Sequence, residues 1–555
     1  MERKFSSKRI VILTAVLFTF MLLLCSCKDT YDNDFYITAS STDIKYGETV
    51  TVKSADKDTY LSSWQFKCSP DFEITNQSSD EITVTPKREG VLYLQIFAEE
   101  GPQSQVVKIT VSREEKMITT ADELISANDP SVRYVLGGDI DMSSVSSFNP
   151  GEFNAALDGK GFAIKNFTYT PTHLVKENNL GFWSNNTGII ENVVFENAAV
   201  GIYSEASSAG IVAGINSGTI RNVTVKGLLS AEMTNNVGGI CGINNGTVAD
   251  CTSEAVIEGK EITGGIAGTS VSAISGSKNI GVVEGTVNVG GIVGKVTEAC
   301  TISGNDNSGE VSGTTNVGGV IGAASDDKIV QINSCANNGE VSGTNLVGGV
   351  IGSGNSAVMF GCKNFGMINA VSNYVGGIGG KVYSARRCEN SGAVNAAGRD
   401  VAKKDGYYEI YVAGIAGYVR EISECSNHQR ITMTAEYGLY IGGVAGYLDG
   451  TNAETKLNNN YNEGEITTAK SAKYVGGVIG YMTNASLRGT VNEGDVNGGS
   501  YTAGAVGYIK SGGIYFTTNK GAVRASEVNQ ITFSADDNVT VFNSTAEGTA
   551  GARED

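Results

Sequence analysis

The chain has 555 residues, with 72 Gly, only 6 Pro and a formal net charge of −18. Gly and Pro together stay below the share typical of low-complexity chains, and no Gly-X-Y triplet runs through the sequence, which excludes collagen. An acidic chain without a basic stripe repels phosphate backbones, so no nucleic-acid partner is expected. The Gly excess therefore indicates a folded architecture that requires Gly at regular positions.

Residues 1–26 are predicted to be an export signal. Four basic residues precede the apolar run from Ile10 to Leu24, which is shorter than the roughly 20 residues of a membrane span. The segment from Leu24 to Cys27 resembles the bacterial lipobox, which implies that cleavage leaves Cys27 as the lipid-carrying N-terminus, anchored in outer-membrane lipid. An ordinary secretory signal with two incidental Cys residues is the alternative.

Two short regions follow the signal. Residues 27–34 form an acidic tether that resembles those of surface lipoproteins in anaerobic Gram-negative gut bacteria, which implies display on the outer face of the outer membrane. Residues 35–113 alternate in polarity over several short runs, as in an antiparallel sandwich, and Trp64 resembles the buried Trp of Ig-like stalk modules. We expect an Ig-like β-sandwich that acts as a spacer. The predicted strands are 35–38, 49–52, 64–67, 81–84, 91–96 and 106–111.

A short motif repeats through the rest of the chain. An apolar residue followed by Gly-Gly, two further residues and another Gly recurs with a mean step of about 29 residues, within the range of solenoid repeats. The apolar runs are too brief for helices, so each repeat predicts one coil of short strands with tight corners, and about twelve coils are expected. The second Gly of each copy falls at 210, 239, 265, 291, 319, 349, 377, 414, 443, 477 and 504.

A second motif, Asn-x-Gly, lies inside each repeat. Stacked coils place equivalent residues about 4.8 Å apart, so these Asn side chains should form a hydrogen-bonded ladder, and the Gly should permit a positive φ at the corner. The repeated Asn residues are Asn279, Asn307, Asn337, Asn364, Asn390, Asn427, Asn462, Asn492 and Asn519.

These two motifs together resemble the GLUG repeat of bacterial surface proteins, over roughly residues 119–525. The resemblance implies a long parallel β-helix, and we expect this β-solenoid to span 114–545 within an all-β chain. The segment from Thr120 to Glu123 is a capping box that predicts a short helical N-terminal cap. Residues 546–555 are predicted to be a disordered tail.

No catalytic, cofactor or metal motif stands out. There is no CxxC pair, and His173 and His428 have no ligand spacing and no evident nucleophile. The carboxylates Asp139, Asp141 and Asp158 fall in the cap and first coil, where turn formation is their simplest role. No cofactor and no metal are therefore expected. Four Cys residues at equivalent positions should stack as buried thiols, although pairing between adjacent coils is geometrically conceivable: Cys335, Cys362, Cys388 and Cys425.

Tyr is the most informative outward residue. One Tyr precedes the Gly-Gly strand in each distal coil, where earlier coils carry Asn, and a second Tyr follows the last Gly of that strand. Stacked rings could offer an apolar strip to sugar rings or to an aromatic-rich partner, or could simply pack against one another. The candidate ligand-binding residues are Tyr374, Tyr411, Tyr440, Tyr474 and Tyr501.

The sequence as a whole favours a non-catalytic, lipid-anchored cell-surface protein. Its expected function is adhesion or ligand capture through a repetitive surface, with a host or bacterial glycan or a surface protein as partner. Two alternatives stay open: a polysaccharide-active β-helix enzyme, either a lyase or a glycoside hydrolase, and a structural component of a surface coat.

Overall fold

The computed structural model describes residues 35–55, 66–78, 81–98, 103–145, 148–171, 178–203, 205–371, 373–398, 403–404, 407–451, 456–534 and 539–553. The predicted signal and tether, Cys27, Trp64 and His173 lie outside these residues. The chain divides into two compact units, 1–115 with 130–133, and 116–129 with 134–555.

The first unit is built of short β-strands around an apolar core. One sheet has the order β1-β3-β6-β5, a second has the order β2-β9-β7, and β4 pairs with β8. Alternate residues such as Val50, Val52, Ile82 and Val84 are buried between the strands, as their spacing in the sequence predicts. The strands are β1 (Ile37–Ala39), β2 (Asp43–Lys45), β3 (Val50–Ser54), β4 (Phe66–Cys68), β5 (Phe72–Gln77), β6 (Glu81–Pro86), β7 (Gly90–Leu94), β8 (Ile96–Ala98) and β9 (Val107–Ser112).

The six strands predicted for this unit all have counterparts in the structure, with one difference in length. The long run 91–96 is divided at Gln95 into β7 and β8, and the two strands belong to different sheets. Strands β2 and β5 are not predicted from the sequence, because Asp43–Lys45 is short and most residues of Phe72–Gln77 are polar. Strand β2 pairs with β9 in a parallel arrangement, whereas the other pairs are antiparallel.

A short helix precedes the coils, as the capping box predicts. Helix α2 (Ala121–Ser126) begins after Thr120, whose hydroxyl accepts a hydrogen bond from the Glu123 amide, while the Glu123 carboxylate accepts from the Thr120 amide. Leu124 is the buried residue of this helix. Strand β10 (Glu114–Ile118) leads into the helix and pairs with β11 (Val132–Leu136).

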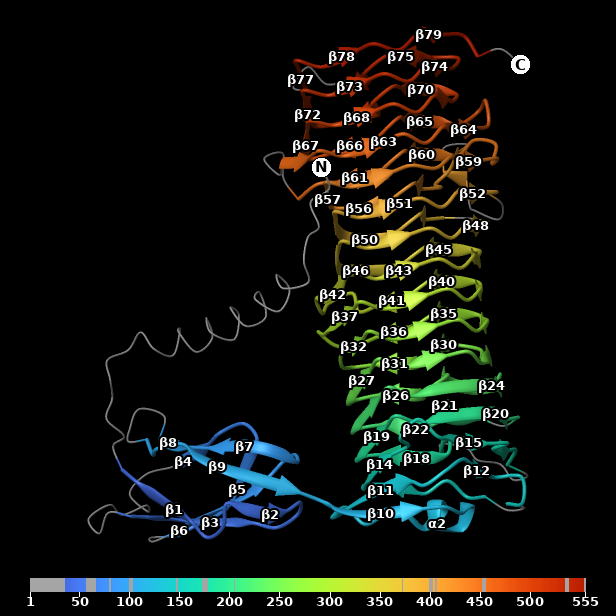
Figure 1. Ribbon diagram of the computed structural model, residues 1–555. Coiled ribbons are helices and arrows are strands. Elements are labelled where there is room, and N and C mark those ends of the chain that lie inside the picture. The colour runs from blue at the N-terminus through green and yellow to red at the C-terminus, as the bar shows by residue number, and fades with distance from the viewer. Residues whose placement is uncertain are drawn as a thin grey trace, which may run out of the picture. The chain divides into compact units, whose positions relative to one another are not determined.

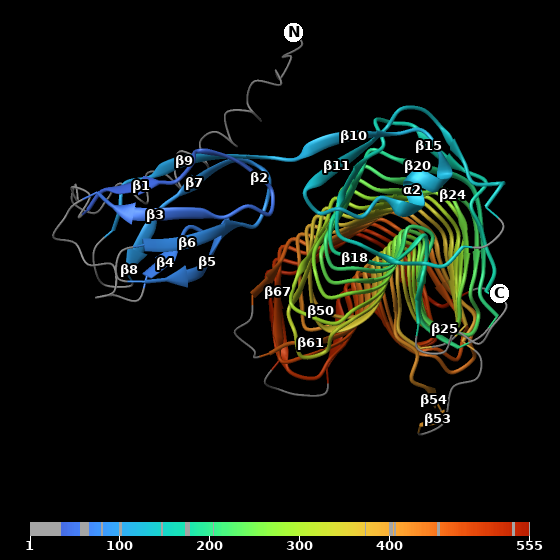
Figure 2. The same cartoon turned by 90° about the horizontal axis from the view of Figure 1, so that it is seen from below.

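From about residue 140 onward the chain forms a parallel β-solenoid of about 14 turns, two more than the repeat spacing predicts. Figure 1 shows the coils stacked from the green to the red end of the chain, and Figure 2 looks along the stack. Three long sheets of 24, 27 and 13 strands run along it. One coil consists of β40 (Thr315–Gly318) in the 13-stranded sheet, β41 (Ile321–Ala324) and β42 (Val330–Asn333) in the 24-stranded sheet, and β43 (Ala336–Asn337) and β44 (Val341–Gly343) in the 27-stranded sheet.

Apolar side chains of equivalent positions stack inside the coils. Val311 pairs with Val341 and Val317 pairs with Val347 in parallel register, and all four are fully buried. Because each coil repeats the same inward positions, one continuous apolar core extends along the solenoid.

The predicted Asn ladder is confirmed. From Asn279 to Asn519, each Asn Nδ2 donates to the Oδ1 of the equivalent Asn in the next coil at 2.8 Å. The same Nδ2 donates to the carbonyl oxygen two residues further on, such as that of Gly339 for Asn337, and these Asn residues are fully buried. The ladder therefore satisfies buried polar groups while fixing the register of successive coils.

The reason expected for the corner glycines is wrong. The glycines of the Asn-x-Gly and Gly-Gly motifs, such as Gly309 and Gly319, are not among the residues with positive φ. A Cβ on Gly309 would overlap the carbonyl oxygen of Gly281, and one on Gly265 would lie 2.6 Å from the Asn279 side-chain carbon. Adjacent coils approach so closely at these glycines that a Cβ would overlap the neighbouring coil, although Gln429 takes the Gly position after Asn427 and Ala413 takes the position of the first motif Gly.

The tail prediction is wrong as far as residue 553. Strand β78 (Thr545–Ala546) pairs with β73 (Thr518–Asn519), and β79 (Ala550–Gly551) pairs with β74 (Val523–Arg524). The last coil lacks the full Asn-x-Gly motif but keeps Gly548, which takes the corner position after Gly521.

Replacing Asn337 with Ala should destabilise the coils on either side. The substitution removes the acceptor for the Asn307 amide and the donor to the Asn364 side-chain oxygen and the Gly339 carbonyl. We therefore expect the free energy of unfolding to fall by about 3 kcal/mol. Hydrogen exchange of the backbone amides in these coils measures it. The control is Asn338→Ala, an exposed neighbour whose loss should cost less than about 0.5 kcal/mol; equal costs for the two variants would contradict a stabilising role for the ladder.

Candidate functional site

The candidate tyrosines form the first of two columns on the distal coils. They precede or begin strands of the 13-stranded sheet: Tyr374 before β49 (Val375–Gly376), Tyr411 before β55 (Val412–Ala413), and Tyr440, Tyr474 and Tyr501 within β60 (Leu439–Gly442), β65 (Lys473–Gly476) and β70 (Ser500–Ala503). The second column lies in the 24-stranded sheet: Tyr418 in β56 (Ala416–Val419), Tyr447 in β61 (Ala445–Asp449), Tyr481 in β66 (Ile479–Thr483) and Tyr508 in β71 (Val506–Ile509).

Within each column the rings stack face to face. In the first column, the ring centroids of Tyr374 and Tyr411 are 4.4 Å apart with planes 2° apart, and Tyr440 and Tyr474 are 5.7 Å apart. In the second column, the spacings lie between 5.0 and 5.6 Å. Each inner ring therefore has both faces covered by its neighbours in the column.

The two columns also pack edge to face against each other. Tyr440 meets Tyr447 at 5.1 Å with planes 81° apart, and Tyr474 meets Tyr481 at 5.2 Å. Gly446, directly before Tyr447, allows the two strands of this coil to approach each other closely. A Cβ on Gly446 would lie 2.6 Å from the Tyr440 carbonyl oxygen. We call these nine residues the tyrosine double column. Such aromatic pairs stabilise by about 0.5–1.5 kcal/mol each beyond their area burial.

Most residues of the first column have an unusual backbone. Tyr374, Tyr440, Tyr474 and Tyr501 have φ between 49° and 62°, in the left-handed region that bulky residues avoid. Asn288 and Asn316 hold the same conformation in earlier coils, and Asn tolerates it. The distal coils, which have Tyr where the earlier coils have Asn, therefore carry more backbone strain, and the stacking of the rings offsets it.

The earlier coils carry a polar version of the same surface. Asn288 and Asn316 are joined by a hydrogen bond of 2.8 Å, and the Ser353 hydroxyl donates to Asn316 Oδ1 at 2.9 Å. Lys381 marks the boundary, because its ammonium lies 5.6 Å from the ring centre of Tyr374 and 5.5 Å from that of Tyr418. The sequence predicted the change from Asn to Tyr but not the interlocking of the columns, which depends on a corner between two sheets.

The rings are partly covered by the fold. Tyr411 is buried and the other eight are half-buried. Burial raises the pKa of the Tyr481 hydroxyl to about 12, and burial together with the nearby Asp449 carboxylate raises the pKa of Tyr418 to about 12. The hydroxyl of Tyr418 donates to Asp449 Oδ2 at 2.6 Å. With ring faces stacked, the double column offers ring edges and hydroxyls to a ligand.

The four stacked Cys residues are buried free thiols. Cys362 donates to the Ile332 carbonyl at 3.3 Å and Cys425 to the Ala385 carbonyl at 3.4 Å, both in the preceding coil. Asn305 and Asn460, at the same position in other coils, donate to the equivalent carbonyls through their amides. These positions therefore supply a side-chain donor between coils, and burial raises the pKa of Cys335 to about 12.

The carboxylates of the first coils are held in local contacts. Asp139 pairs with Lys165 at 2.8 Å, Asp141 accepts from Asn166 at 3.0 Å, and Asp158 accepts from the Lys160 amide at 2.9 Å. Each stabilises a turn or a contact between neighbouring coils. Among the described residues, no group of three or more His, Cys, Asp or Glu side chains could hold a metal ion.

A Ser–His–Glu chain that the sequence did not predict lies on the 27-stranded sheet. His428 Nε2 is 3.1 Å from Ser426 Oγ, and His428 Nδ1 is 3.0 Å from Glu463 Oε2. This connectivity is that of a hydrolase triad, but the Ser426 and His428 amides donate to Cys388 and Asn390 carbonyls in the ladder. Neither amide is free to stabilise an oxyanion. Stabilisation of the oxyanion is usually the largest single contribution to catalysis in such enzymes.

Comparisons with known proteins give limited matches. No protein-family profile matches the chain. A Haloquadratum walsbyi protein named Halomucin is 32% identical over 124 residues, which cover 19% of this chain and 1% of that protein. A solved structure from Bacteroides ovatus, provisionally named an immunoglobulin A1 protease, is 21% identical with a TM-score of 0.33, covering 46% of this chain and 77% of the other. In the described part of the chain, no helix has the length and apolar character needed to cross a membrane.

The tyrosine double column should make stability depend on alkaline pH. Because the folded state raises the pKa of Tyr418 and Tyr481 from 10.0 to about 12, their contribution is present below pH 10 and is lost as the pH rises to about 12. Urea unfolding across this range measures the loss. In the double variant Tyr418→Phe/Tyr481→Phe the loss between pH 10 and 12 should be smaller; an unchanged pH profile would contradict the assignment.

Proposed function

We propose that this chain is a non-catalytic, lipid-anchored protein of the bacterial outer membrane that captures ligands or mediates adhesion through its solenoid. The observation that carries the proposal is the repetitive wall itself: equivalent side chains recur in parallel register along about 14 turns. A repetitive β-solenoid is compatible with a surface protein, because it presents the same chemical groups many times along one direction.

The N-terminal features support the same proposal. The lipobox-like segment ending at Cys27 and the acidic residues 27–34 suit an anchored protein displayed to the exterior. We propose that the first unit is an Ig-like spacer, that helix α2 caps the first coils, and that the solenoid is of the GLUG type. The unit's apolar core of short strands suits a spacer.

An enzyme is less well supported by the geometry. The acidic residues of the first coils are committed to turns and coil contacts, and the Ser426–His428–Glu463 chain lacks oxyanion donors from its own strand. A polysaccharide lyase or glycoside hydrolase needs paired carboxylates or a base facing a substrate groove. We therefore place ligand capture ahead of catalysis, and ahead of a purely structural coat role.

Lipidation can be tested on the full chain expressed in a Gram-negative host. Cys27→Ser should abolish incorporation of labelled fatty acid and release the protein from the membrane fraction, whereas the matched control Cys25→Ser should leave both unchanged. Lipidation that survives Cys27→Ser, or is lost in Cys25→Ser, would contradict the assignment of Cys27.

The role of the tyrosine double column can be tested by binding of the full chain to a glycan and matrix-protein array. If the column contacts the ligand, Tyr411→Ala/Tyr440→Ala/Tyr474→Ala should weaken binding about tenfold or more. The corresponding Phe variant keeps the stacking and removes only the hydroxyls, so it separates ligand contact from folding. Undiminished binding by the Ala variant would exclude the column as a binding surface.

A further inference from the structure

A groove lies along one corner of the solenoid, where the 27-stranded sheet ends. It has a volume of 640 Å³ and follows the carboxyl ends of five strands of the 27-stranded sheet, where the chain turns toward the 13-stranded sheet. One wall is a column of hydroxyl and amide side chains in parallel register: Ser312, Ser342, Asn369, Asn395 and Thr432. We call this the corner groove.

The residue that follows the wall residue at the turn is small in four of the five coils of the groove. Gly313, Gly343, Ala370 and Ala396 follow the wall residues at the turn. A Cβ on Gly343 would lie 2.8 Å from the Cγ2 of Val347, whereas Met433, at the equivalent position of the fifth coil, is buried in the core. The groove is already formed before any ligand arrives.

The wall has hydrogen-bonding capacity that the fold does not use. Within the described residues, the hydroxyls of Ser312, Thr344 and Thr432 have no hydrogen-bond partner. Asn395 Nδ2 donates to Asn369 Oδ1 at 2.9 Å, which leaves the Asn395 oxygen as an acceptor, and Asn369 Nδ2 donates to Glu340 Oε1 at 2.6 Å. The wall thus offers oriented donors and acceptors at successive coils, and none of its five side chains is charged.

The same arrangement recurs further along the corner. Glu465 accepts from Thr467 at 3.2 Å and from Asn497 Nδ2 at 3.0 Å, as Glu340 does from Ser342 at 3.3 Å and from Asn369. Glu465, Thr467 and Asn497 line a second hollow of 480 Å³. A carboxylate that accepts hydrogen bonds from a hydroxyl of its own strand and from an amide of the next coil is therefore a repeated unit.

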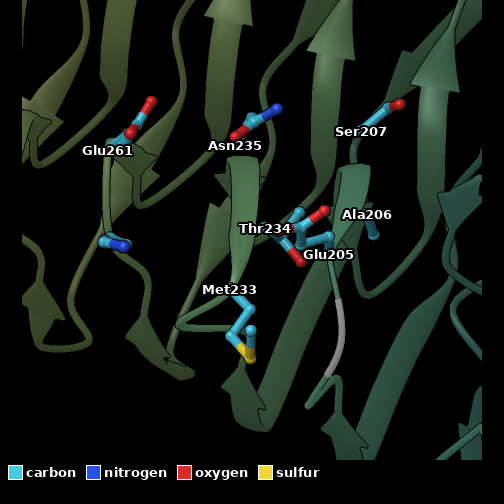
Figure 3. A pocket seen from close by; sticks show the side chains of 8 residues that line it. Glu205, Ala206, Ser207, Met233, Thr234, Asn235 and Glu261 are labelled. Atoms are coloured by element: carbon cyan, nitrogen blue, oxygen red, sulfur yellow. The ribbon is translucent and has the colours of Figure 1, made fainter. Parts of the chain in front are cut away.

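The corner also continues in the opposite direction, to the pocket in Figure 3. Backbone hydrogen bonds connect Lys260 to Thr286, Thr286 to Thr314 and Thr314 to Thr344, one coil at a time. The pocket has a volume of 410 Å³, and its lining includes Thr234, whose hydroxyl is buried without a partner among the described residues. An unsatisfied buried hydroxyl costs free energy that a bound ligand could recover.

We propose that the corner groove binds an extended, uncharged polysaccharide chain lying along the solenoid axis. Coils stack about 4.8 Å apart, close to the length of one hexose in an extended glycan, so each sugar would meet one coil. Sugar hydroxyls both donate and accept, as the wall requires. A chain of charge −18 disfavours binding of polyanions. The Gly and Ala residues in the lining leave room for a narrow chain such as an extended glycan.

The inference depends on the proposed ligand-capture function and names its ligand class and site. The test is binding of the purified full chain to linear neutral oligosaccharides of glucose, mannose and xylose, from disaccharide to octasaccharide. Affinity should rise with length until the oligosaccharide spans the five coils of the groove and then level off. Asn395→Ala/Thr432→Ala should weaken binding about tenfold, from the loss of two hydrogen bonds.

Two further variants keep the test decisive. Ala397→Trp fills the groove at a partly exposed position and should abolish binding, whereas Ser308→Ala/Ser391→Ala removes two hydroxyls from the same sheet outside the groove and should leave binding unchanged. Absence of binding to every neutral oligosaccharide, or equal affinity of the groove variants and the wild type, would overturn the inference. If the full chain binds no neutral oligosaccharide but still binds matrix proteins on the array, the groove proposal fails while the adhesion function stands.

Discussion

The close approach of successive coils at their corners is the constraint on which the rest of the solenoid depends. At the Gly-Gly and Asn-x-Gly corners, the backbone of one coil lies where a Cβ of the next would be, so most copies of the repeat have Gly there. The same approach brings each buried Asn to 2.8 Å from its equivalent in the next coil. The backbone contacts and the Asn ladder therefore fix the same register between successive coils. Outward residues at equivalent positions are aligned by this register.

Two surfaces of different chemistry follow from that register. Where two sheets meet at Gly446 and its equivalents, outward residues of both strands interlock, and in the distal coils they form the tyrosine double column. Where the chain turns from the 27-stranded to the 13-stranded sheet, small residues follow the wall in four of its five coils, and a groove with a hydroxyl and amide wall remains. The tyrosines cover one another's ring faces, whereas the groove wall keeps hydrogen-bonding groups open, which is why the groove is our first choice for an extended glycan.

The sequence predicted the repetitive elements well and the corners poorly. A period of about 29 residues is enough to infer stacked coils, the Asn ladder and the column of tyrosines, because each depends on equivalence between repeats. The reason for the glycines was misjudged, since a motif does not distinguish positive φ from a lack of space for a Cβ. The corner groove and the Ser426–His428–Glu463 chain could not be predicted, because both depend on which residues of different coils face one another across a turn.

The central claim is that the corner glycines are required by lack of space, and one pair of substitutions tests it most directly. Gly319 lies at a Gly-Gly corner, where a Cβ would overlap the Gly349 carbonyl and Asn337, whereas Gly304 has a φ of 63° and open space around it. The free energy of unfolding should fall by at least about 2 kcal/mol in Gly319→Ala and change little in Gly304→Asn, since Asn459 adopts this conformation at the equivalent corner. A small loss in Gly319→Ala together with a large loss in Gly304→Asn would contradict the account, because backbone conformation rather than coil contact would then explain the glycines.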